Sequence, residues 1–337
     1  MFVLAAAFVV WCAWYWAAPY SIPEARPEFT DRGAAVAQIQ PLNSPKFVTS
    51  GEADQYLKDY GLGLSVEYNG QGRFYPFQFL VWHEVVNDIW GKDHLLVTYC
   101  PLCQSGAVFR APTNDLNEPL ILQAAAVLLD NNLVLETQDG ARRWQQLTGT
   151  ALTDNMSDLQ VMPSTVWQWQ DWRQANPNGL VMALPETTDR DYTRNPYQDF
   201  RKSILFPLSH KDLRLSLFTP VMALVLPNET RAYVPEAAAV EQVVNDLVDN
   251  RPIVLFFDDA GAIWRAYERV SLIDGATLTF KVEEGTLEDI ETGSLWSAQG
   301  RALGGPRRGE QLVQLPLWFV NWFCLAARFP NLTLHLP

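Results

Sequence analysis

The feature that most constrains the fold of this chain is an internal repeat at a spacing of 158 residues (231 minus 73). Arg73-Phe-Tyr75 recurs as Arg231-Ala-Tyr233, and the motif Val-Val-Asn-Asp at 85–88 recurs at 243–246. An apolar, strand-like run follows each copy of that motif. Ordered matches at one spacing are the signature of duplicated structural units. The sequence therefore predicts two tandem copies of a related unit.

The same order of residues continues further along the chain at a spacing of 153 residues (316 minus 163). The matched pairs are Pro163 and Pro316, Trp169 and Trp322, and Pro177 and Pro330. Each copy combines several short apolar strands with a Trp-bearing helix, and 19 Gly and 22 Pro residues mark frequent turns between them. This pattern predicts a β-rich α+β fold, preceded by an N-terminal membrane-anchor or signal helix.

The repeat also sets the expected domain boundaries. The first repeat, which carries a Cys-x-x-Cys motif, spans 51–184, and the second spans 221–337. A connecting segment, 185–220, joins the two repeats. A linker rich in proline and polar residues, 21–50, precedes the first repeat, and residues 1–20 form the apolar N-terminal segment.

The N-terminal segment has no charged residue before Glu24, and 2–18 is continuously apolar. Seventeen apolar residues reach the lower limit for a helix that spans a bilayer. Aromatic residues crowd the C-terminal end of the run, as in a belt at the lipid headgroups. We favour an uncleaved anchor; a cleaved signal peptide and a buried helix are the alternatives. Either an anchor or a signal peptide predicts a globular part outside the cytoplasm, in the periplasm or at the cell surface.

The charge of the chain argues against one class of partner. The formal net charge is −13, from 25 basic and 38 acidic residues, and no Lys/Arg cluster offsets it. Such a surface repels polyanions, so we expect no nucleic-acid partner. No P-loop or dinucleotide-binding fingerprint is present, so no nucleotide cofactor is expected. The expected partners are the membrane, through the N-terminal segment, and a membrane protein complex.

The candidate site of chemistry is Cys100 and Cys103, a Cys-x-x-Cys that ends an apolar strand. His83 and Glu84 lie a short distance upstream. The second repeat keeps the shared motifs but has neither the thiols nor the imidazole at the equivalent positions. The fold therefore does not require these residues, which makes a function the better explanation for them.

A metal site is one of three chemistries that suit this motif. Cys100, Cys103 and His83 supply three ligands of the kind that copper, or a zinc ion with one open position, prefers. Glu84 and Asp88 are candidates to hold those ligands in place. The expected cofactor is therefore copper or zinc.

The other two chemistries involve a disulfide. A bond between Cys100 and Cys103 suits an oxidising compartment. Thiol–disulfide exchange also uses this motif, although Pro101 disfavours the helix that usually follows it. Cys12 and Cys324 lie in apolar segments and are expected to be small buried residues without reactive thiols. The sequence leaves metal, disulfide and exchange chemistry open.

These motifs together resemble an uncharacterised, largely bacterial family, catalogued as domain of unknown function number 3179. The resemblance covers roughly Gln38 to the C-terminus. It rests on His83-Glu-Val-Val-Asn-Asp88, Val97-Thr-Tyr-Cys-Pro-Leu-Cys103, Arg190-Asp-Tyr-Thr-Arg-Asn-Pro-Tyr197 and Glu291-Thr-Gly-Ser-Leu-Trp296. It implies an exported or membrane-anchored protein, and it implies no established activity. The stretch 114–130 departs from the family pattern, which puts in doubt any site that relatives build there.

The leading hypothesis is a membrane-anchored, extracytoplasmic protein with a metal-binding or thiol-redox site in the first repeat. The alternative is a non-catalytic accessory or structural subunit of a membrane protein complex. The sequence names neither a reaction nor a substrate, so whether the protein is an enzyme is left open.

Overall fold

The computed structural model describes residues 30–31, 39–68, 70–186, 190–197, 204–258 and 263–335. Strands dominate these ranges, and no helix in them is longer than seven residues, so the prediction of a β-rich fold with short helices is confirmed. No helix of the described ranges has the length and apolar character needed to cross a bilayer. The predicted membrane segment and most of the predicted linker lie outside the described residues.

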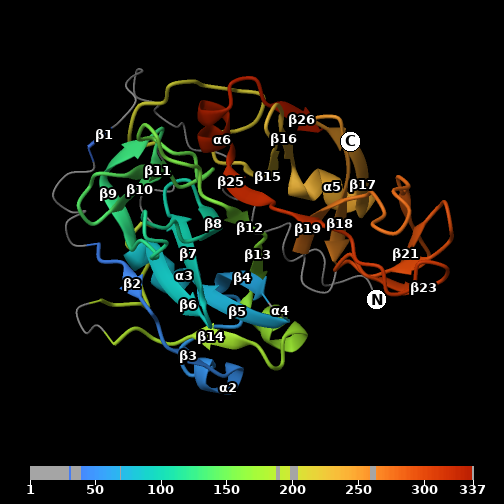
Figure 1. Cartoon of the computed structure of the whole chain (residues 1–337), viewed down its shortest axis with the longest axis horizontal. Helices are drawn as coiled ribbons and strands as arrows, with labels where there is room; N and C mark the ends of the chain where they lie inside the picture. The colour runs from blue at the N-terminus through green and yellow to red at the C-terminus, as the bar shows by residue number, and fades with distance from the viewer. Residues whose placement is uncertain are drawn as a thin grey trace.

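Three sheets form the first half of the molecule, blue to green in Figure 1. Their strand orders are β13-β4-β5-β14-β3, β12-β8-β7-β6-β2 and β1-β9-β10-β11. The strands are β1 (Thr30–Asp31), β2 (Leu42–Asn43), β3 (Phe47–Val48), β4 (Leu62–Tyr68), β5 (Gln71–Pro76), β6 (Val85–Trp90), β7 (Asp93–Cys100), β8 (Ser105–Arg110), β9 (Leu122–Leu129), β10 (Asn132–Thr137), β11 (Arg143–Gln145), β12 (Val161–Met162), β13 (Thr165–Gln168) and β14 (Leu180–Met182). The helices are α2 (Ser50–Ala53), α3 (Phe77–His83) and α4 (Trp169–Ala175).

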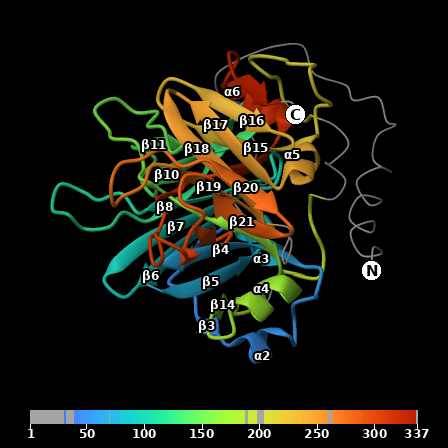
Figure 2. The same ribbon diagram turned by 90° about the vertical axis from the view of Figure 1, so that its right-hand side faces the viewer.

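Three further sheets form the second half, yellow to red in Figure 1, which faces the viewer in Figure 2. Their strand orders are β25-β15-β16-β26, β17-β18-β19-β24 and β20-β21-β22-β23. The strands are β15 (Pro220–Val225), β16 (Thr230–Tyr233), β17 (Val243–Val248), β18 (Arg251–Asp258), β19 (Ile263–Glu268), β20 (Phe280–Glu283), β21 (Thr286–Asp289), β22 (Leu295–Trp296), β23 (Ala302–Gly304), β24 (Gln314–Leu315), β25 (Trp318–Asn321) and β26 (Thr333–His335). The helices are α5 (Pro235–Glu241) and α6 (Trp322–Arg328).

Several contacts recur in both halves. The parallel pair of β5 with β14 in the first half has a counterpart in the second, β16 with β26. In each half an asparagine side chain also joins two sheets. It does so through a pair of hydrogen bonds to the backbone of one residue in the neighbouring sheet. Asn87 makes them with Leu122 (2.9 and 3.0 Å), and Asn245 makes them with Phe280 (2.7 and 2.9 Å). These asparagines are the ones that recur in the Val-Val-Asn-Asp motif.

The short helix that precedes each copy of this motif ends in the same conformation. Glu84 follows α3 with φ 60°, and Gln242 follows α5 with φ 61°. A residue in the left-handed region ends a helix and redirects the chain. In the first half the chain enters β6 directly at Val85. This turn fixes His83 and Glu84 at the junction between α3 and β6.

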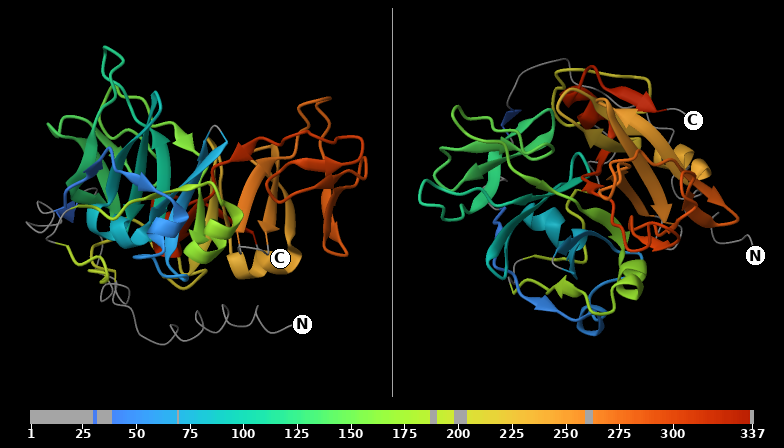
Figure 3. Two further views of the ribbon diagram at one scale, coloured as in Figure 1. Left: turned by 90° about the horizontal axis from the view of Figure 1, so that it is seen from below. Right: turned by 45° about the vertical axis from the view of Figure 1, so that its right-hand side comes forward.

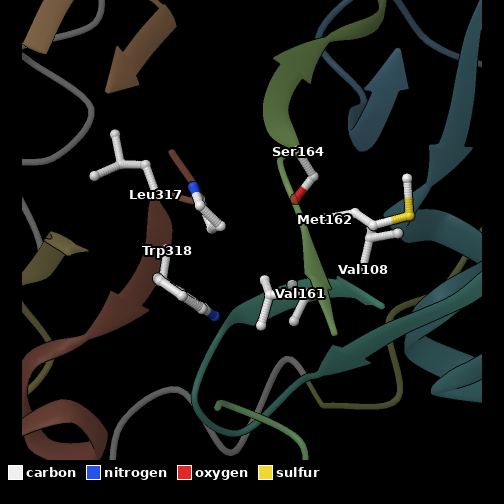
Figure 4. Close-up of a pocket in the computed structure, with 9 residues that line it drawn as sticks. Val108, Val161, Met162, Ser164, Leu317 and Trp318 are labelled. Atoms are coloured by element: carbon white, nitrogen blue, oxygen red, sulfur yellow. The ribbon is translucent and has the colours of Figure 1, made fainter. Parts of the chain in front are cut away.

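One apolar core continues from the first half into the second. Phe109 and Trp144 of the first half belong to the same buried cluster as Val221 and Trp322 of the second. The halves lie side by side in Figure 3. The crevice at their boundary, lined in part by β8, β12 and β25 in Figure 4, has a cavity volume of about 10 Å³. That volume leaves room for about one water molecule, so the halves pack closely.

Candidate functional site

The Cys-x-x-Cys motif lies in a β-hairpin. β7 ends at Cys100, β8 begins at Ser105, and these two residues are partners in the strand pairing. Cys103 falls in the turn between them, and Gln104 has φ 52°, a left-handed conformation that reverses the chain. Cys100 and Cys103 are both fully buried. The motif therefore does not stand at a helix N-terminus, the position that lowers thiol pKa values in many redox proteins.

A disulfide joins Cys103 to Cys324, which α6 carries. The two residues are 221 positions apart, and the bond ties the second half to the first. Cys324 is buried, as expected, but the sequence did not predict its bond to Cys103. Cys100 is not disulfide-bonded, so the alternative bond between Cys100 and Cys103 is not formed. The pairing depends on how the halves pack, which no local pattern of cysteines reveals.

A two-residue turn gathers all three sulfurs. Asp130 and Asn131 connect β9 to β10 with φ values of 51° and 64°, the combination that tight hairpins require. The Cys100 thiol donates to the Asn131 carbonyl oxygen at 3.6 Å, and the Cys103 sulfur lies 3.4 Å from that oxygen. The Cys324 sulfur lies 3.7 Å from the Asp130 carbonyl oxygen. Both the Cys100 and the Cys103 sulfur contact the Asn131 carbonyl oxygen. The two sulfurs are therefore at most 7.0 Å apart, the sum of their distances to that oxygen.

The connecting segment holds this turn in place. The side-chain amide of Asn131 donates to the Phe206 carbonyl at 2.9 Å and accepts from the Phe206 N–H at 3.0 Å. The Asp130 carboxylate accepts from the N–H and the hydroxyl of Ser209 at 2.6 and 2.9 Å. The carbonyls that contact the sulfurs are therefore fixed by residues of a segment that lies between the two halves in sequence.

A buried polar network lies beside Cys100 on the hairpin. The Gln146 amide donates to the Thr98 hydroxyl at 3.1 Å and accepts from the Ser105 hydroxyl at 3.0 Å and the Asn132 amide at 2.9 Å. All four side chains are buried, and a satisfied buried network makes its surroundings rigid. The sequence patterns did not predict this network. The one feature that could have indicated it is the occurrence of single polar residues within otherwise apolar strands.

His83 is buried at the end of α3, and both ring nitrogens have protein partners. Nδ1 lies 2.7 Å from the Gln40 carbonyl oxygen, and Nε2 lies 2.7 Å from the Tyr192 hydroxyl. Within the described ranges, no three His, Cys, Asp or Glu side chains are gathered to hold a metal ion. The site of Cys100, Cys103 and His83 therefore stays a prediction that the observed contacts do not favour.

Glu84 and Asp88, the proposed supports for metal ligands, make contacts of other kinds. Glu84 is fully buried, and the Tyr197 hydroxyl donates to its carboxyl group at 2.8 Å. Asp88 accepts from Arg73 at 2.5 Å and from the Tyr75 hydroxyl at 2.7 Å. Asp246, 158 residues later, receives the matching bonds from Arg231 and Tyr233 at 2.8 and 2.9 Å. Asp88 thus belongs to contacts that both halves share.

The segment from Arg190 to Tyr197 packs over the end of α3. Besides the Tyr192 and Tyr197 bonds, the Trp82 indole donates to the Arg194 carbonyl oxygen at 3.1 Å. Arg190 also stacks over the Trp82 ring, with 5.6 Å between the guanidinium carbon and the ring centroid. The segment is thus a structured loop against the first half.

We expect Tyr197→Phe to lower the free energy of unfolding by about 1–3 kcal/mol, because it removes a donor from a buried carboxyl group. Tyr60→Phe is the control, since Tyr60 is 74% exposed, and its effect should stay within about 0.5 kcal/mol. Urea unfolding followed by Trp fluorescence measures both. Equal stabilities of the two variants would contradict an anchoring role for Tyr197.

Comparison with known proteins gives one match. No curated protein and no solved structure matches the chain. A family model described as "Protein of unknown function (DUF3179)" matches residues 37–332, which include the cysteine hairpin, the segment over α3 and α6. The chain therefore belongs to the DUF3179 family.

Proposed function

We propose that this chain is an extracytoplasmic, membrane-associated protein whose chemistry is thiol–disulfide exchange at Cys100, Cys103 and Cys324. One observation carries the proposal: the Cys100 thiol shares a carbonyl contact with a sulfur of the Cys103–Cys324 disulfide. Exchange requires a thiolate that attacks a disulfide sulfur. A thiol held beside a disulfide is the smallest arrangement that supplies both reactants.

The disulfide also supports the proposed location. Disulfides persist in the periplasm and at cell surfaces, and they are rare in the cytosol. The apolar segment 1–20 supports attachment to a membrane. Copper or zinc at this centre is the less supported variant of the proposal. Metal ligands must be thiolates, and the disulfide occupies two of the three sulfurs.

We also infer that the two halves are copies of one unit. The support is the recurrence of the asparagine bonds, the Arg–Tyr–Asp contacts and the strand orders at nearly constant spacing. Where the first copy has Cys100, the second has Asp258, which accepts hydrogen bonds from Gln299 at 3.0 Å and Arg265 at 3.3 Å. The equivalent position in the second copy thus carries an ordinary polar cluster, and the exchange chemistry belongs to the first copy with Cys324.

A redox titration tests the proposal. The chain with Cys12→Ser is equilibrated in glutathione buffers of defined potential, quenched with acid, alkylated in denaturant and analysed by mass spectrometry. We expect the number of labelled thiols to rise from one to three at one reversible midpoint, while near-UV circular dichroism shows a folded protein. The double variant Cys103→Ser/Cys324→Ser should show one labelled thiol at every potential. Three thiols at all potentials, or reduction only on unfolding, would refute exchange.

An accessory subunit of a membrane complex is the second candidate function. Five exposed large apolar residues lie in the segment 272–303, which contains the small sheet β20-β21-β22-β23. They are Leu272, Ile273, Ile290, Leu295 and Leu303, which are 41–69% exposed. Exposed apolar groups of this kind mark interaction surfaces when they are contiguous. The titration separates the two candidates, because a purely structural disulfide in a subunit resists reduction until the protein unfolds.

A further inference from the structure

We propose that the disulfide between the halves exchanges internally with Cys100. The product is a second form in which Cys100 and Cys103 are bonded and Cys324 is a thiol. This inference rests on the proposed function and deepens it, since it names the attacking sulfur, the sulfur attacked and the sulfur released.

Burial selects an internal reaction over one with an external thiol. Cys100, Cys103 and Cys324 are each at most 1% exposed. Exchange rates depend on access as well as on the thiolate fraction, so the Cys100 thiol reacts with this disulfide faster than a thiol that must enter from solvent. Cys100 already lies inside the same buried space, within 7.0 Å of the Cys103 sulfur.

The position of Cys103 makes it the sulfur that is attacked. Cys100 and Cys103 belong to one hairpin, so a bond between them spans a short turn and leaves the rest of the molecule in place. A Cys100–Cys324 bond would instead need a sulfur of the second half to move along the Asp130–Asn131 turn. The Cys100 thiol contacts Asn131, as Cys103 does, while Cys324 contacts Asp130.

The reaction balances without an external oxidant or reductant. The Cys100 thiol loses its proton to solvent, and the thiolate attacks the Cys103 sulfur. The Cys100–Cys103 bond forms as the Cys103–Cys324 bond breaks, and Cys324 leaves as a thiolate that takes up a proton. One disulfide and one thiol are present before and after the step.

The two disulfide forms differ in what holds the halves together. In the observed form α6 is covalently tied to the cysteine hairpin. In the exchanged form the nearby links are non-covalent, such as the Asn321 N–H donating to the Cys103 carbonyl oxygen at 2.9 Å. Arg328 also donates to the Gln145 side chain across the boundary at 2.6 Å. Exchange therefore switches the attachment of α6 between covalent and non-covalent.

The test traps each form and then cuts the chain between Cys103 and Cys324. A protease recognition sequence is inserted after Glu186, whose side chain is 79% exposed, in the chain with Cys12→Ser. The protein is held folded at pH 5 or pH 8.5, quenched with acid and alkylated in denaturant. Acid stops exchange because it removes thiolate. The chain is then cleaved and analysed on a non-reducing gel and by mass spectrometry.

We expect two populations after incubation at pH 8.5. In one, the fragments stay linked and the label is on Cys100. In the other, the fragments separate and the label is on Cys324, and this population grows with time at pH 8.5 and not at pH 5. Cys100→Ser should keep the fragments linked at both pH values, and Cys324→Ala should give separate fragments with a Cys100–Cys103 bond.

The outcomes separate this inference from the proposed function. A label confined to Cys100 at every time and pH would overturn internal exchange, even if the redox titration remained reversible. Peptide mapping that finds no disulfide at Cys103 would overturn both proposals. Near-UV circular dichroism of the starting protein confirms that each measurement begins from the folded chain, so loss of folding is not mistaken for exchange.

Discussion

Replacing Asp88 with asparagine should lower the free energy of unfolding by about 3 kcal/mol, the lower end of the range for breaking a buried ion pair by removing one partner. The Asp88 side chain is 1% exposed and that of Arg73 is 11% exposed. Asparagine keeps the size of the side chain but removes the negative charge. The guanidinium of Arg73 would then lie in a largely buried site without its counter-ion.

The surroundings of Arg73 make this loss hard to relieve. Its guanidinium carbon lies 4.1 Å from the centroid of the Phe47 ring and 4.2 Å from that of Trp90. Burial raises the pKa of Tyr75 well above its usual value, and the charge of Asp88 raises it further. The Tyr75 hydroxyl therefore stays protonated and donates to Asp88, a bond that asparagine weakens.

The second half offers a matched control, Asp246→Asn. Arg231 keeps a second carboxylate partner, Glu229 at 2.6 Å, and the Arg231 and Asp246 side chains are 22% and 12% exposed. We expect this substitution to cost about 1 kcal/mol, because solvent and Glu229 compensate the charge. Urea unfolding of both variants gives the comparison. Equal losses of unfolding free energy in Asp88→Asn and Asp246→Asn would mean that the deeper burial of the Arg73–Asp88 pair does not determine its contribution to stability.

Loss of the disulfide is the second large effect that we expect. Cys324→Ala opens a loop of 221 residues, for which the chain-entropy model gives about 5 kcal/mol and measured disulfides give about 2–5 kcal/mol. The variant should unfold at a lower urea concentration than the oxidised parent. Addition of dithiothreitol should bring the parent down to the level of the variant.

Cys100→Ala is the control for the disulfide prediction. It removes a sulfur from the same centre but leaves the long loop closed, so it should lose only about 1 kcal/mol, the usual contribution of one hydrogen bond. Its stability should still fall when reductant is added. If Cys324→Ala and Cys100→Ala unfold together in the absence of reductant, the cross-link contributes little to stability.

The sequence predicts the contacts that lie within one half better than those that join the halves. The repeat picks out Arg73, Tyr75 and Asp88, and these three residues form one hydrogen-bonded group. Four cysteines allow several pairings that spacing does not distinguish. The partner of Cys103 is set by the packing of α6 against the first half, and the two cysteines are 221 positions apart in sequence.

The surroundings of His83 illustrate the same limit. Its closeness in sequence to the cysteine strand predicted a shared site. The ring is instead engaged by Gln40, before the first repeat, and Tyr192, in the connecting segment. Neither partner carries a local pattern that points to a histidine. Sequence patterns therefore do not predict the part of the site that is formed by loops crossing the ends of several helices and strands.

The Cys103–Cys324 bond has a consequence for the history of the fold. If the halves descend from one unit, this bond had no intramolecular counterpart in the single-unit ancestor, because its two sulfurs come from different copies. There it would have joined two separate chains, and its formation would have depended on their concentration. On that descent, fusion of the copies would have turned the encounter of the sulfurs into an intramolecular event with a high effective concentration. In the fused chain the bond therefore forms independently of how dilute the protein is.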